Sequence, residues 1–240
     1  MIELRNLTKR FGKTVAVDDL SLVIGKGEFF TIIGPNGAGK TTTLKLVAGL
    51  LKPTGGRVFV GGFDMAGQSD RAKSIMSYIP DIPYVYEKLT GREFLYFTGE
   101  LYRLDPRRYR ADTEELLELF LMKDQANQLL ESYSHGMRQK IVISSALLSD
   151  PRIIIIDEPM VGLDPRSIRL VKDILRKRAL GGTTVFMSTH TLSLAEEISD
   201  RLGIIHQGKF VALGNAGDIK KAAVDSEGLE DVFLKMTAED

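Results

Sequence analysis

The chain has 240 residues, of which 43% are hydrophobic, and it carries 32 basic side chains, 32 acidic side chains and no cysteine. A formal net charge of zero argues against a surface that attracts nucleic acid or anionic membranes as a whole, although it leaves room for a local basic site. The lack of cysteine excludes disulfides and thiolate metal sites. No hydrophobic run exceeds four residues, against the ~20 that span a bilayer, and the N-terminal residues lack the apolar core of a signal peptide. We therefore expect a soluble cytoplasmic globular protein.

The first third of the chain predicts two kinds of β structure. Residues 2–24 and 57–63 have the pattern of short strands and hairpins, which predicts a small antiparallel layer. Residues 29–33 are apolar and β-branched, and they are followed by a glycine-rich turn and a helical stretch from Gly39 to Leu50. This order of strand, turn and helix is typical of an α/β core.

The middle of the chain, residues 84–149, is predicted to be a mainly helical subdomain inserted into that core. All seven tyrosines fall between Tyr78 and Tyr133. Thr90 and Glu93 form a capping box that opens a helix.

The last third returns to alternating strands and helices. Four consecutive isoleucines at 153–156 predict a strand that is buried on both faces of a parallel sheet. Residues 183–187 and 202–205 predict further strands. Between them lie helical patterns at 165–180, opened by Asp164 and Pro165 at the cap and first helical positions, and at 191–199.

These patterns predict one α/β domain with a mainly parallel sheet, a small N-terminal antiparallel β layer and an inserted α-helical subdomain. The predicted division has residues 1–83 and 150–215 as the α/β core with its β layer, 84–149 as the helical subdomain and 216–240 as a short helical tail.

Residues 34–41 read GPNGAGKT and fit the phosphate-loop pattern G-x-x-x-x-G-K-[ST]. Glycines let backbone N–H groups converge on phosphate oxygens at a helix N-terminus, while the lysine binds the β/γ-phosphates and the threonine hydroxyl binds Mg²⁺. A glycine-rich turn could match by chance, but the preceding strand and following helix favour a P-loop NTPase core. The predicted nucleotide-contacting residues are Gly34, Pro35, Asn36, Gly37, Ala38, Gly39, Lys40, Thr41 and Thr42.

Two acidic residues follow the isoleucine strand. The carboxyl ends of parallel strands are where open α/β sheets bind ligands, so Asp157 is predicted to hold Mg²⁺ and Glu158 to activate the attacking water as general base. Read alone, such a pair could be a solvated strand end. Together with the phosphate loop, it predicts a nucleoside triphosphatase or a kinase.

The remaining motifs narrow the class. Ser134 to Gln139 (SHGMRQ) lies 23 positions before Asp157 at the start of a helical segment, Asp164 follows Glu158 closely, and His190 follows a predicted strand. In motif order and spacing, over about residues 2–215, the chain resembles the ATP-binding cassette (ABC) ATPases, the nucleotide-binding subunits of ABC transporters. The resemblance implies ATP and Mg²⁺ as cofactors.

The resemblance also implies a role for individual residues. Phe11 corresponds to the aromatic residue that stacks on adenine, usually Tyr, although Phe11 could instead be a core residue. His190 corresponds to the switch-loop residue that senses the γ-phosphate, Asp164 to the D-loop, and Asp81 to the Q-loop position that contacts Mg²⁺ or the attacking water. Residues 133–137 stand where the family has its LSGGQ signature: Ser134 and Gly136 are kept, while His135 replaces Gly and Met137 replaces Gln.

Family membership would imply two partners. A second cassette, either a copy of this chain or a paralogue, closes head to tail so that Ser134, Gly136 and Met137 of one subunit complete the phosphate site of the other. A separate transmembrane permease would hold the chain at the inner face of the cell membrane. The aromatics between Tyr84 and Tyr102 would be divided between helical core and a groove for a permease helix.

The signature and the short tail resemble those of exporter cassettes, so export is favoured over import. A soluble ABC protein that acts on ribosomes or DNA is the first alternative, disfavoured by the single cassette and the neutral charge; no nucleic-acid partner is expected. A P-loop kinase or GTPase is the second alternative.

Overall fold

The computed structural model describes residues 1–222, 230, 233 and 234. They divide into two compact units. The first comprises Met1–Met76, Arg152–Glu158 and the described residues from Arg176 onward, and the second comprises Ser77–Pro151 and Pro159–Leu175. The predicted helical segment 84–149 falls inside the second unit, while the three-part division inferred from the sequence stays a prediction. Of the predicted tail, residues 223–229, 231–232 and 235–240 lie outside the described residues.

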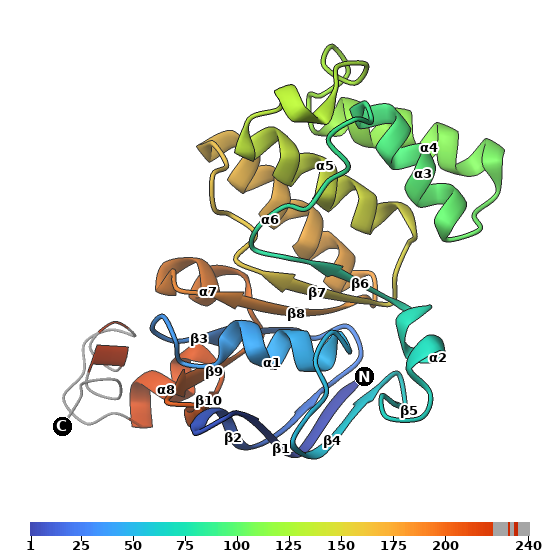
Figure 1. Cartoon of the computed structure of the whole chain (residues 1–240). Coiled ribbons are helices and arrows are strands. Elements are labelled where there is room, and N and C mark those ends of the chain that lie inside the picture. The colour runs from blue at the N-terminus through green and yellow to red at the C-terminus, as the bar shows by residue number, and fades with distance from the viewer. Residues whose placement is uncertain (223–229, 231–232, 235–240) are drawn as a thin grey trace. The chain divides into compact units, whose positions relative to one another are not determined.

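The first unit contains the predicted antiparallel layer (Figure 1). Its strand order is β2-β1-β4-β5, and all neighbours in it pair antiparallel. Side chains that point to one face, such as Ile2, Leu4 and Leu7, are buried. The strands of this layer are β1 (Ile2–Phe11), β2 (Thr14–Ile24), β4 (Gly55–Val60) and β5 (Phe63–Asp64).

The second sheet of this unit is mainly parallel, as predicted. β3 pairs parallel with β8 and β9, β7 pairs parallel with β8, and β10 joins the edge antiparallel to β9. Every residue of β3 and β7 is buried, which explains why both strands are mainly apolar. The strands of this sheet that lie wholly in the first unit are β3 (Phe29–Ile33), β7 (Ile153–Asp157), β8 (Thr184–Thr189), β9 (Arg201–His206) and β10 (Lys209–Gly214).

Helix α1 (Lys40–Val47) contacts β2 and β4 of the first sheet and β7 and β8 of the second, so it lies between the two layers (Figure 1). The predicted helix reached Leu50, but the helix ends at Val47 with Ala48 as its C-cap. The reason is Gly49, which adopts a left-handed φ of 66° and stops the helix as glycine commonly does. The other helices of this unit are α2 (Ser69–Lys73), α7 (Leu192–Ile198) and α8 (Ala216–Ala222).

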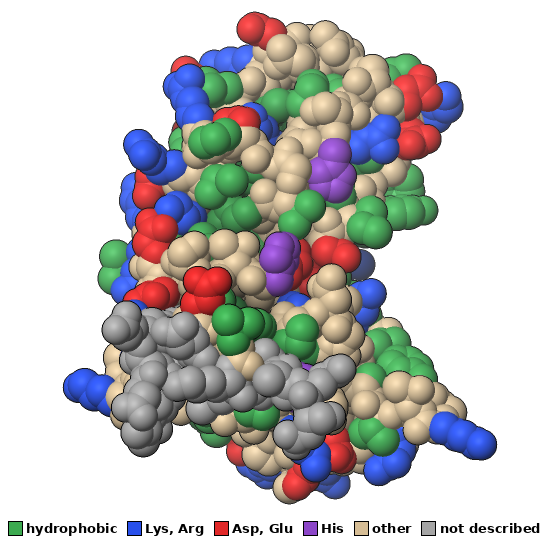
Figure 2. Space-filling model, turned by 90° about the vertical axis from the view of Figure 1, so that its left-hand side faces the viewer, with side chains coloured by type: hydrophobic (Ala, Val, Ile, Leu, Met, Phe, Trp, Pro, Cys, Tyr) green, Lys and Arg blue, Asp and Glu red, His purple; other side chains and the backbone are tan. Residues whose placement is uncertain are grey.

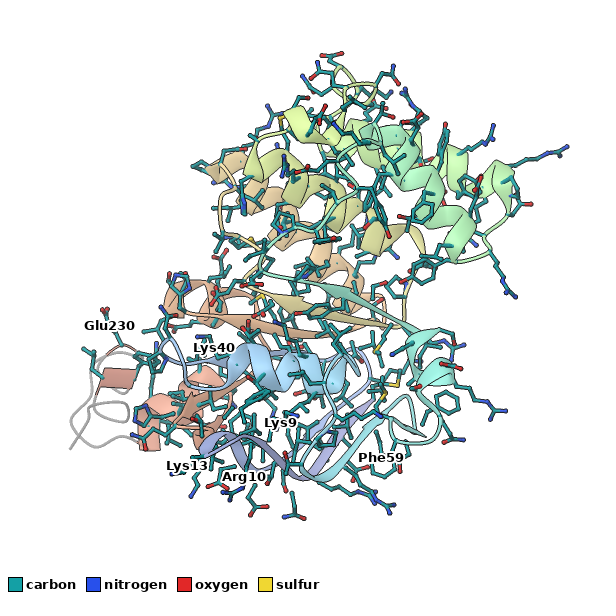
Figure 3. All side chains as sticks on the ribbon, in the orientation of Figure 1. Lys9, Arg10, Lys13, Lys40, Phe59 and Glu230 are labelled. Carbon is teal, nitrogen blue, oxygen red and sulfur yellow. The ribbon has the colours of Figure 1, made fainter. Side chains whose placement is uncertain are left out.

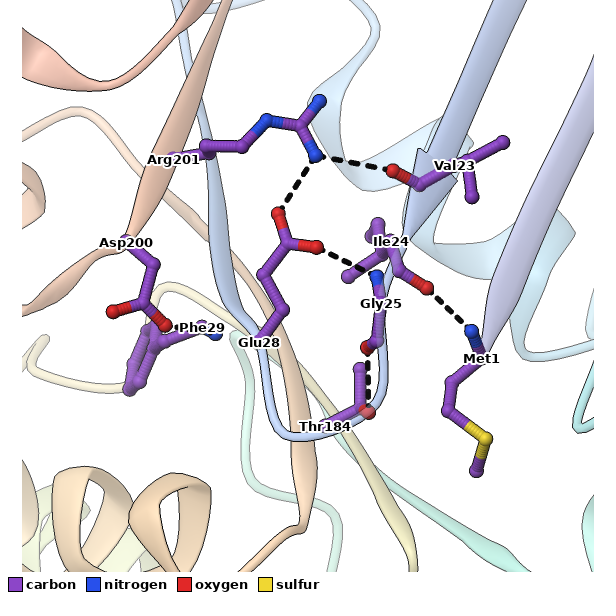
Figure 4. A network of polar contacts seen from close by, with 9 residues as sticks. All are labelled: Met1, Val23, Ile24, Gly25, Glu28, Phe29, Thr184, Asp200 and Arg201. Atoms are coloured by element: carbon purple, nitrogen blue, oxygen red, sulfur yellow. Dashed lines mark hydrogen bonds and ion pairs between the residues drawn. The ribbon is translucent and has the colours of Figure 1, made fainter.

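A polar network fixes the loop between β2 and β3 to the second sheet (Figure 4). Glu28 accepts hydrogen bonds from the Gly25 amide at 2.6 Å and from the Arg201 guanidinium at 2.8 Å. The Thr184 hydroxyl donates to the Gly25 carbonyl at 3.0 Å. These contacts join segments about 170 residues apart and hold β3 in register ahead of the phosphate loop.

The second unit is helical in its larger part. α3, α4 and α5 pack against one another, and an Arg92–Glu114 ion pair at 2.7 Å links α3 to α4. The predicted Thr90–Glu93 capping box is confirmed, with both of its hydrogen bonds formed. Its elements are α3 (Gly91–Leu101), α4 (Pro106–Leu119), the short 3₁₀ helix η1 (Leu130–Ser132) and α5 (His135–Leu148).

Two elements cross the boundary between the units along the chain, β6 (Met76–Ile79) and α6 (Pro165–Leu180). The α/β class, the antiparallel layer and the mainly parallel sheet are therefore confirmed. In the described part of the chain, no helix is both long enough and apolar enough to cross a membrane.

Candidate active site

The phosphate loop connects β3 to α1 in the first unit. Gly39, the residue before α1, has a φ of 107°, and a Cβ there would lie 2.3 Å from the Ala16 carbonyl oxygen. Only glycine fits this conformation and this close approach. No side chain caps α1, and its first turn has no acidic residue. Its first N–H groups therefore suit an anionic ligand.

Lys40 is the buried cation of this loop (Figure 3). Its Nζ donates to the carbonyl oxygens of Gly34 at 2.7 Å and Pro35 at 3.1 Å. Burial lowers the pKa of Lys40, an effect that the nearby carboxylates of Glu158 and Asp157 oppose. A desolvated ammonium that is held by carbonyl dipoles gains strongly from a phosphate, which brings full negative charge.

The acidic pair ends β7 in the same unit. Asp157 is fully buried, and its Oδ1 accepts a hydrogen bond from the Ser188 hydroxyl of β8. The two residues face each other in the parallel register of β7 and β8. Glu158 follows with a φ of 47°, and its amide donates to the Ser188 carbonyl at 3.2 Å. A left-handed glutamate is strained, a condition that clusters at active sites.

His190 lies one residue beyond β8. Its Nδ1 is 3.0 Å from Oε2 of Glu158, and the histidine is mostly exposed whereas the glutamate is mostly buried. The structure thus brings together Asp157, Glu158 and His190 at the carboxyl ends of neighbouring strands.

Phe11 ends β1, and its side chain is 48% exposed, so it is not a core residue. The following strand β2 ties it to the phosphate loop. The Ala16 carbonyl oxygen of β2 lies close to Gly39. The Asp18 amide donates to the Gly208 carbonyl oxygen at 2.9 Å, and the Gly208 amide donates to the Ala38 carbonyl oxygen at 3.0 Å. These short contacts fix the hairpin that carries Phe11 relative to the loop.

The signature residues lie in the second unit. Ser134 caps α5 and accepts a hydrogen bond from the Met137 amide at 3.3 Å. A Cβ on Gly136 would lie 2.6 Å from the Gly162 carbonyl oxygen, and the His135 ring lies against Gly162. Tyr133 is buried, its hydroxyl donating to Gln125. The signature loop therefore packs against the segment around Gly162.

Asp164 also lies in the second unit and caps α6, as predicted. Its carboxylate accepts hydrogen bonds from the Ser167 amide at 2.9 Å and hydroxyl at 2.6 Å. These bonds, aided by Lys140 at 3.6 Å, lower the pKa of Asp164 to about 2. The ion pair links the signature helix to this loop.

Asp81 is half-buried in the irregular segment after β6 and belongs to the second unit. The predicted residues are thus divided: the phosphate loop, Asp157, Glu158, His190 and Phe11 are in the first unit, while Asp81, Ser134, Gly136, Met137 and Asp164 are in the second.

Sequence reasoning missed Ser188 and Lys140. Ser188 belongs to the Ser-Thr-His run that had drawn attention only to its histidine. Lys140 is six residues beyond the signature serine. Its partner Asp164 lies in another segment of the chain, so no local sequence pattern indicates the ion pair.

A phosphate loop between a buried strand and a helix, with an acidic pair at the end of a neighbouring strand, defines a P-loop nucleoside triphosphatase. The sequence profile of the ABC transporter family matches residues 17–161. The chain belongs to this family. It is an ATP-binding subunit and hydrolyses ATP, which rules out the kinase and GTPase alternatives.

Several relatives are named as resistance proteins. The daunorubicin resistance ATP-binding protein DrrA3 of Streptomyces coeruleorubidus is 36% identical over 88% of this chain and 67% of its own length. The linearmycin resistance ATP-binding protein LnrL of Bacillus subtilis is 34% identical over 91% of this chain and 70% of its own. The chain thus spans about two thirds of these relatives. EcsA, an ABC-type transporter ATP-binding protein of B. subtilis, is 32% identical over 100% of this chain and 98% of its own.

Solved structures agree with the fold. The structure of an ATP-binding subunit of an ABC transporter has 31% identity and a TM-score of 0.92, with 98% of this chain and 99% of that chain covered. The ATP-binding cassette MJ0796, in a dimeric post-hydrolysis state bound to ADP and Pi, has 27% identity and a TM-score of 0.82, with 90% of this chain and 98% of that chain covered.

Proposed function

We propose that this cassette drives export through a separate membrane permease, by closing with a second cassette around ATP. The observation that carries the catalytic part is the cluster of Lys40, Asp157, Glu158 and His190 around the phosphate loop in one compact unit.

In this proposal the loop residues 34–42 surround the phosphates. Lys40 leaves its carbonyl partners to bind the β/γ-phosphates, and Phe11 stacks on adenine. A Mg²⁺ ion fits the donors present, because the hydroxyl of Thr41 and the buried carboxylate of Asp157 are oxygen ligands of the kind that it prefers. When bound, Mg²⁺ would neutralise charge on the phosphate oxygens.

Glu158 is the proposed general base. The His190 imidazole nitrogen Nδ1 is 3.0 Å from the Glu158 carboxylate. In this proposal His190 orients the carboxylate and senses the γ-phosphate. The buried Ser188 hydroxyl holds Asp157 in place beside it. Water then attacks the γ-phosphorus in line and gives a proton to Glu158, while the bond from the γ-phosphorus to the bridging oxygen breaks and ADP leaves. Lys40 balances the charge that develops on the phosphate oxygens.

The residues of the second unit act on the partner cassette. Ser134 and Gly136 stand at the N-terminus of α5, a position that favours an anion, and Met137 and Asp164 lie nearby in the same unit. We propose that this surface faces the γ-phosphate of ATP on the other cassette, which is either a second copy or a paralogue. The dimeric MJ0796 structure supports this arrangement. Asp81 would contact Mg²⁺ or the attacking water in the closed state.

The permease would dock on the helical unit. Four of the six aromatic side chains between Tyr84 and Tyr102 are exposed in the described structure, and aromatic anchors are favoured at interfaces. They are Tyr84, Tyr86, Phe97 and Tyr102, accompanied by exposed Ile82 and Leu101. Such docking would keep the chain on the cytoplasmic face of the membrane.

Export is supported by the resistance proteins among the relatives. A nucleic-acid partner is disfavoured, because basic and acidic side chains are interspersed on the face that Figure 2 shows.

The test of the proposal is ATP-dependent dimerisation of a Glu158→Gln variant, measured by light scattering. This substitution blocks hydrolysis while it leaves ATP bound, so the variant should become a dimer with ATP and stay a monomer with ADP. A variant that remains monomeric at saturating ATP would contradict head-to-tail closure.

A further inference from the structure

Lys9 lies directly over the predicted adenine platform. Its Nζ is 4.9 Å from the centroid of the Phe11 ring, within the range of a cation–π interaction. The two residues are at positions i and i+2 of β1, so their side chains share a face of the strand. Lys9 is labelled in Figure 3.

The ammonium of Lys9 is anchored on its other side. Its Nζ donates to the Lys52 carbonyl at 2.8 Å. Two hydrogen bonds hold the segment that carries Lys52 against β1. The Thr54 amide donates to the Thr8 carbonyl oxygen at 2.8 Å, and the Arg10 amide donates to the Thr54 hydroxyl at 3.0 Å. A lysine side chain normally samples many rotamers, but this one is held between a carbonyl and a ring.

Phe11 needs such a restraint. It ends its strand with nearly half of its side chain exposed, and among the described residues no aromatic ring packs against it. An exposed ring loses rotamer freedom when a base stacks on it. A cation already seated on one face fixes the ring before the base arrives and leaves the exposed part for stacking.

We propose that Lys9 is a positioning residue for the adenine base: it orients Phe11 from one side and thereby raises the affinity for ATP. The inference rests on the proposed stacking role of Phe11. The competing explanation is that Lys9 simply adds positive charge that attracts the triphosphate.

The experiment compares two probes, ATP and inorganic tripolyphosphate, which lacks the base. Calorimetric titrations of the full chain in EDTA prevent hydrolysis. Lys9→Met should weaken ATP binding about two- to five-fold and leave tripolyphosphate binding unchanged. Lys9→Arg, whose guanidinium also stacks on rings, should restore ATP binding. Lys13→Met, a matched loss of one charge in the same hairpin, should leave both affinities unchanged.

Phe11→Ala separates the two proposals. If it weakens ATP binding and Lys9→Met adds nothing further in the double variant, the positioning role is supported. If Phe11→Ala weakens ATP binding but Lys9→Met does not, or if Lys9→Met weakens tripolyphosphate equally, the role of Lys9 is wrong while stacking stands. If Phe11→Ala leaves ATP binding unchanged, stacking itself is wrong.

Discussion

The two units of this chain hold their functional groups in different states. In the first unit Lys40, Asp157 and Glu158 are buried or mostly buried, and each is held by a polar partner. Lys40 binds the carbonyls of its own loop, Asp157 accepts from the Ser188 hydroxyl, and Glu158 contacts the mostly exposed His190. In the second unit the signature residues Ser134 and His135 are exposed, and the serine oxygen caps its own helix.

This difference indicates how the work is divided. Buried groups that are held by polar partners are preorganised, which suits a site where charge develops during a reaction. Exposed groups at a helix N-terminus suit a ligand that arrives from outside. We infer that the first unit carries the chemistry and that the second reads whether ATP is present on a partner.

The largest effect is expected in the first unit. Glu158→Gln should reduce ATP turnover by at least about 10²-fold, because an amide cannot accept the proton of the attacking water. ATP binding should be retained. The measurement is phosphate release under saturating ATP.

The matched control for this variant is Glu115→Gln, which changes an exposed glutamate of α4 in the second unit and should leave turnover unchanged. Near-normal turnover in Glu158→Gln would show that Glu158 is not the general base. It would also contradict the inference that the first unit carries the chemistry.

A smaller and qualitatively different effect is expected in the second unit. Ser134→Ala should leave ATP binding by the monomer unchanged but weaken ATP-dependent dimerisation of the Glu158→Gln background by roughly tenfold, since a hydrogen bond to a charged phosphate is lost. Loss of the cap should also lower the free energy of unfolding by about 1 kcal/mol.

Sedimentation analysis over a range of protein concentrations measures this dimerisation. Ser132→Ala, an exposed serine two residues earlier that bonds the Leu129 carbonyl, serves as the control and should dimerise normally. Equal weakening of monomer ATP binding by Ser134→Ala would show that the signature acts within its own chain.

The smallest effect concerns pH. The pKa of Asp164 is lowered to about 2 by its bonds to Ser167, below the unfolded value of 3.8. The ionised carboxylate therefore contributes stability that is fully present above about pH 4 and is lost as the pH falls through 3.8 toward 2.

In urea unfolding, Asp164→Asn should be less stable than the wild type by the same margin at pH 6 and pH 8, and that margin should narrow at pH 3. A margin that stays constant down to pH 3 would show that the capping geometry, and not the charge, carries the stabilisation.

The contiguous parts of the site could be predicted from the sequence. The phosphate loop and the Asp157–Glu158 pair are runs in which the chemistry fixes neighbouring residue types, and the strand before each run is mainly apolar. The helix caps at Thr90 and Asp164 could also be predicted from the sequence, because a cap forms hydrogen bonds with a residue only three positions away.

The remainder depends on contacts between distant segments. Ser188 and Asp157 are 31 residues apart and meet only through the register of two parallel strands. Lys9 reaches Lys52 across 43 residues. Whether Phe11 was a core residue or an exposed platform was also undecided, because one aromatic beside a turn has no periodicity. The predicted extension of helix α1 to Leu50 was an error of another kind. Gly49 was present in the sequence, and glycine is a common signal for the end of a helix.

The left-handed backbone of Glu158 has a consequence for laboratory evolution. A glutamate at a φ of 47° costs about 1–2 kcal/mol of stability, and glycine or asparagine would relieve it. A screen of random variants for thermal tolerance alone should therefore enrich substitutions at this position. The variants that such a screen selects would be more stable and would bind nucleotide, but they would hydrolyse ATP at least about 10²-fold more slowly. Any such screen on this chain therefore needs a turnover assay beside the heat step.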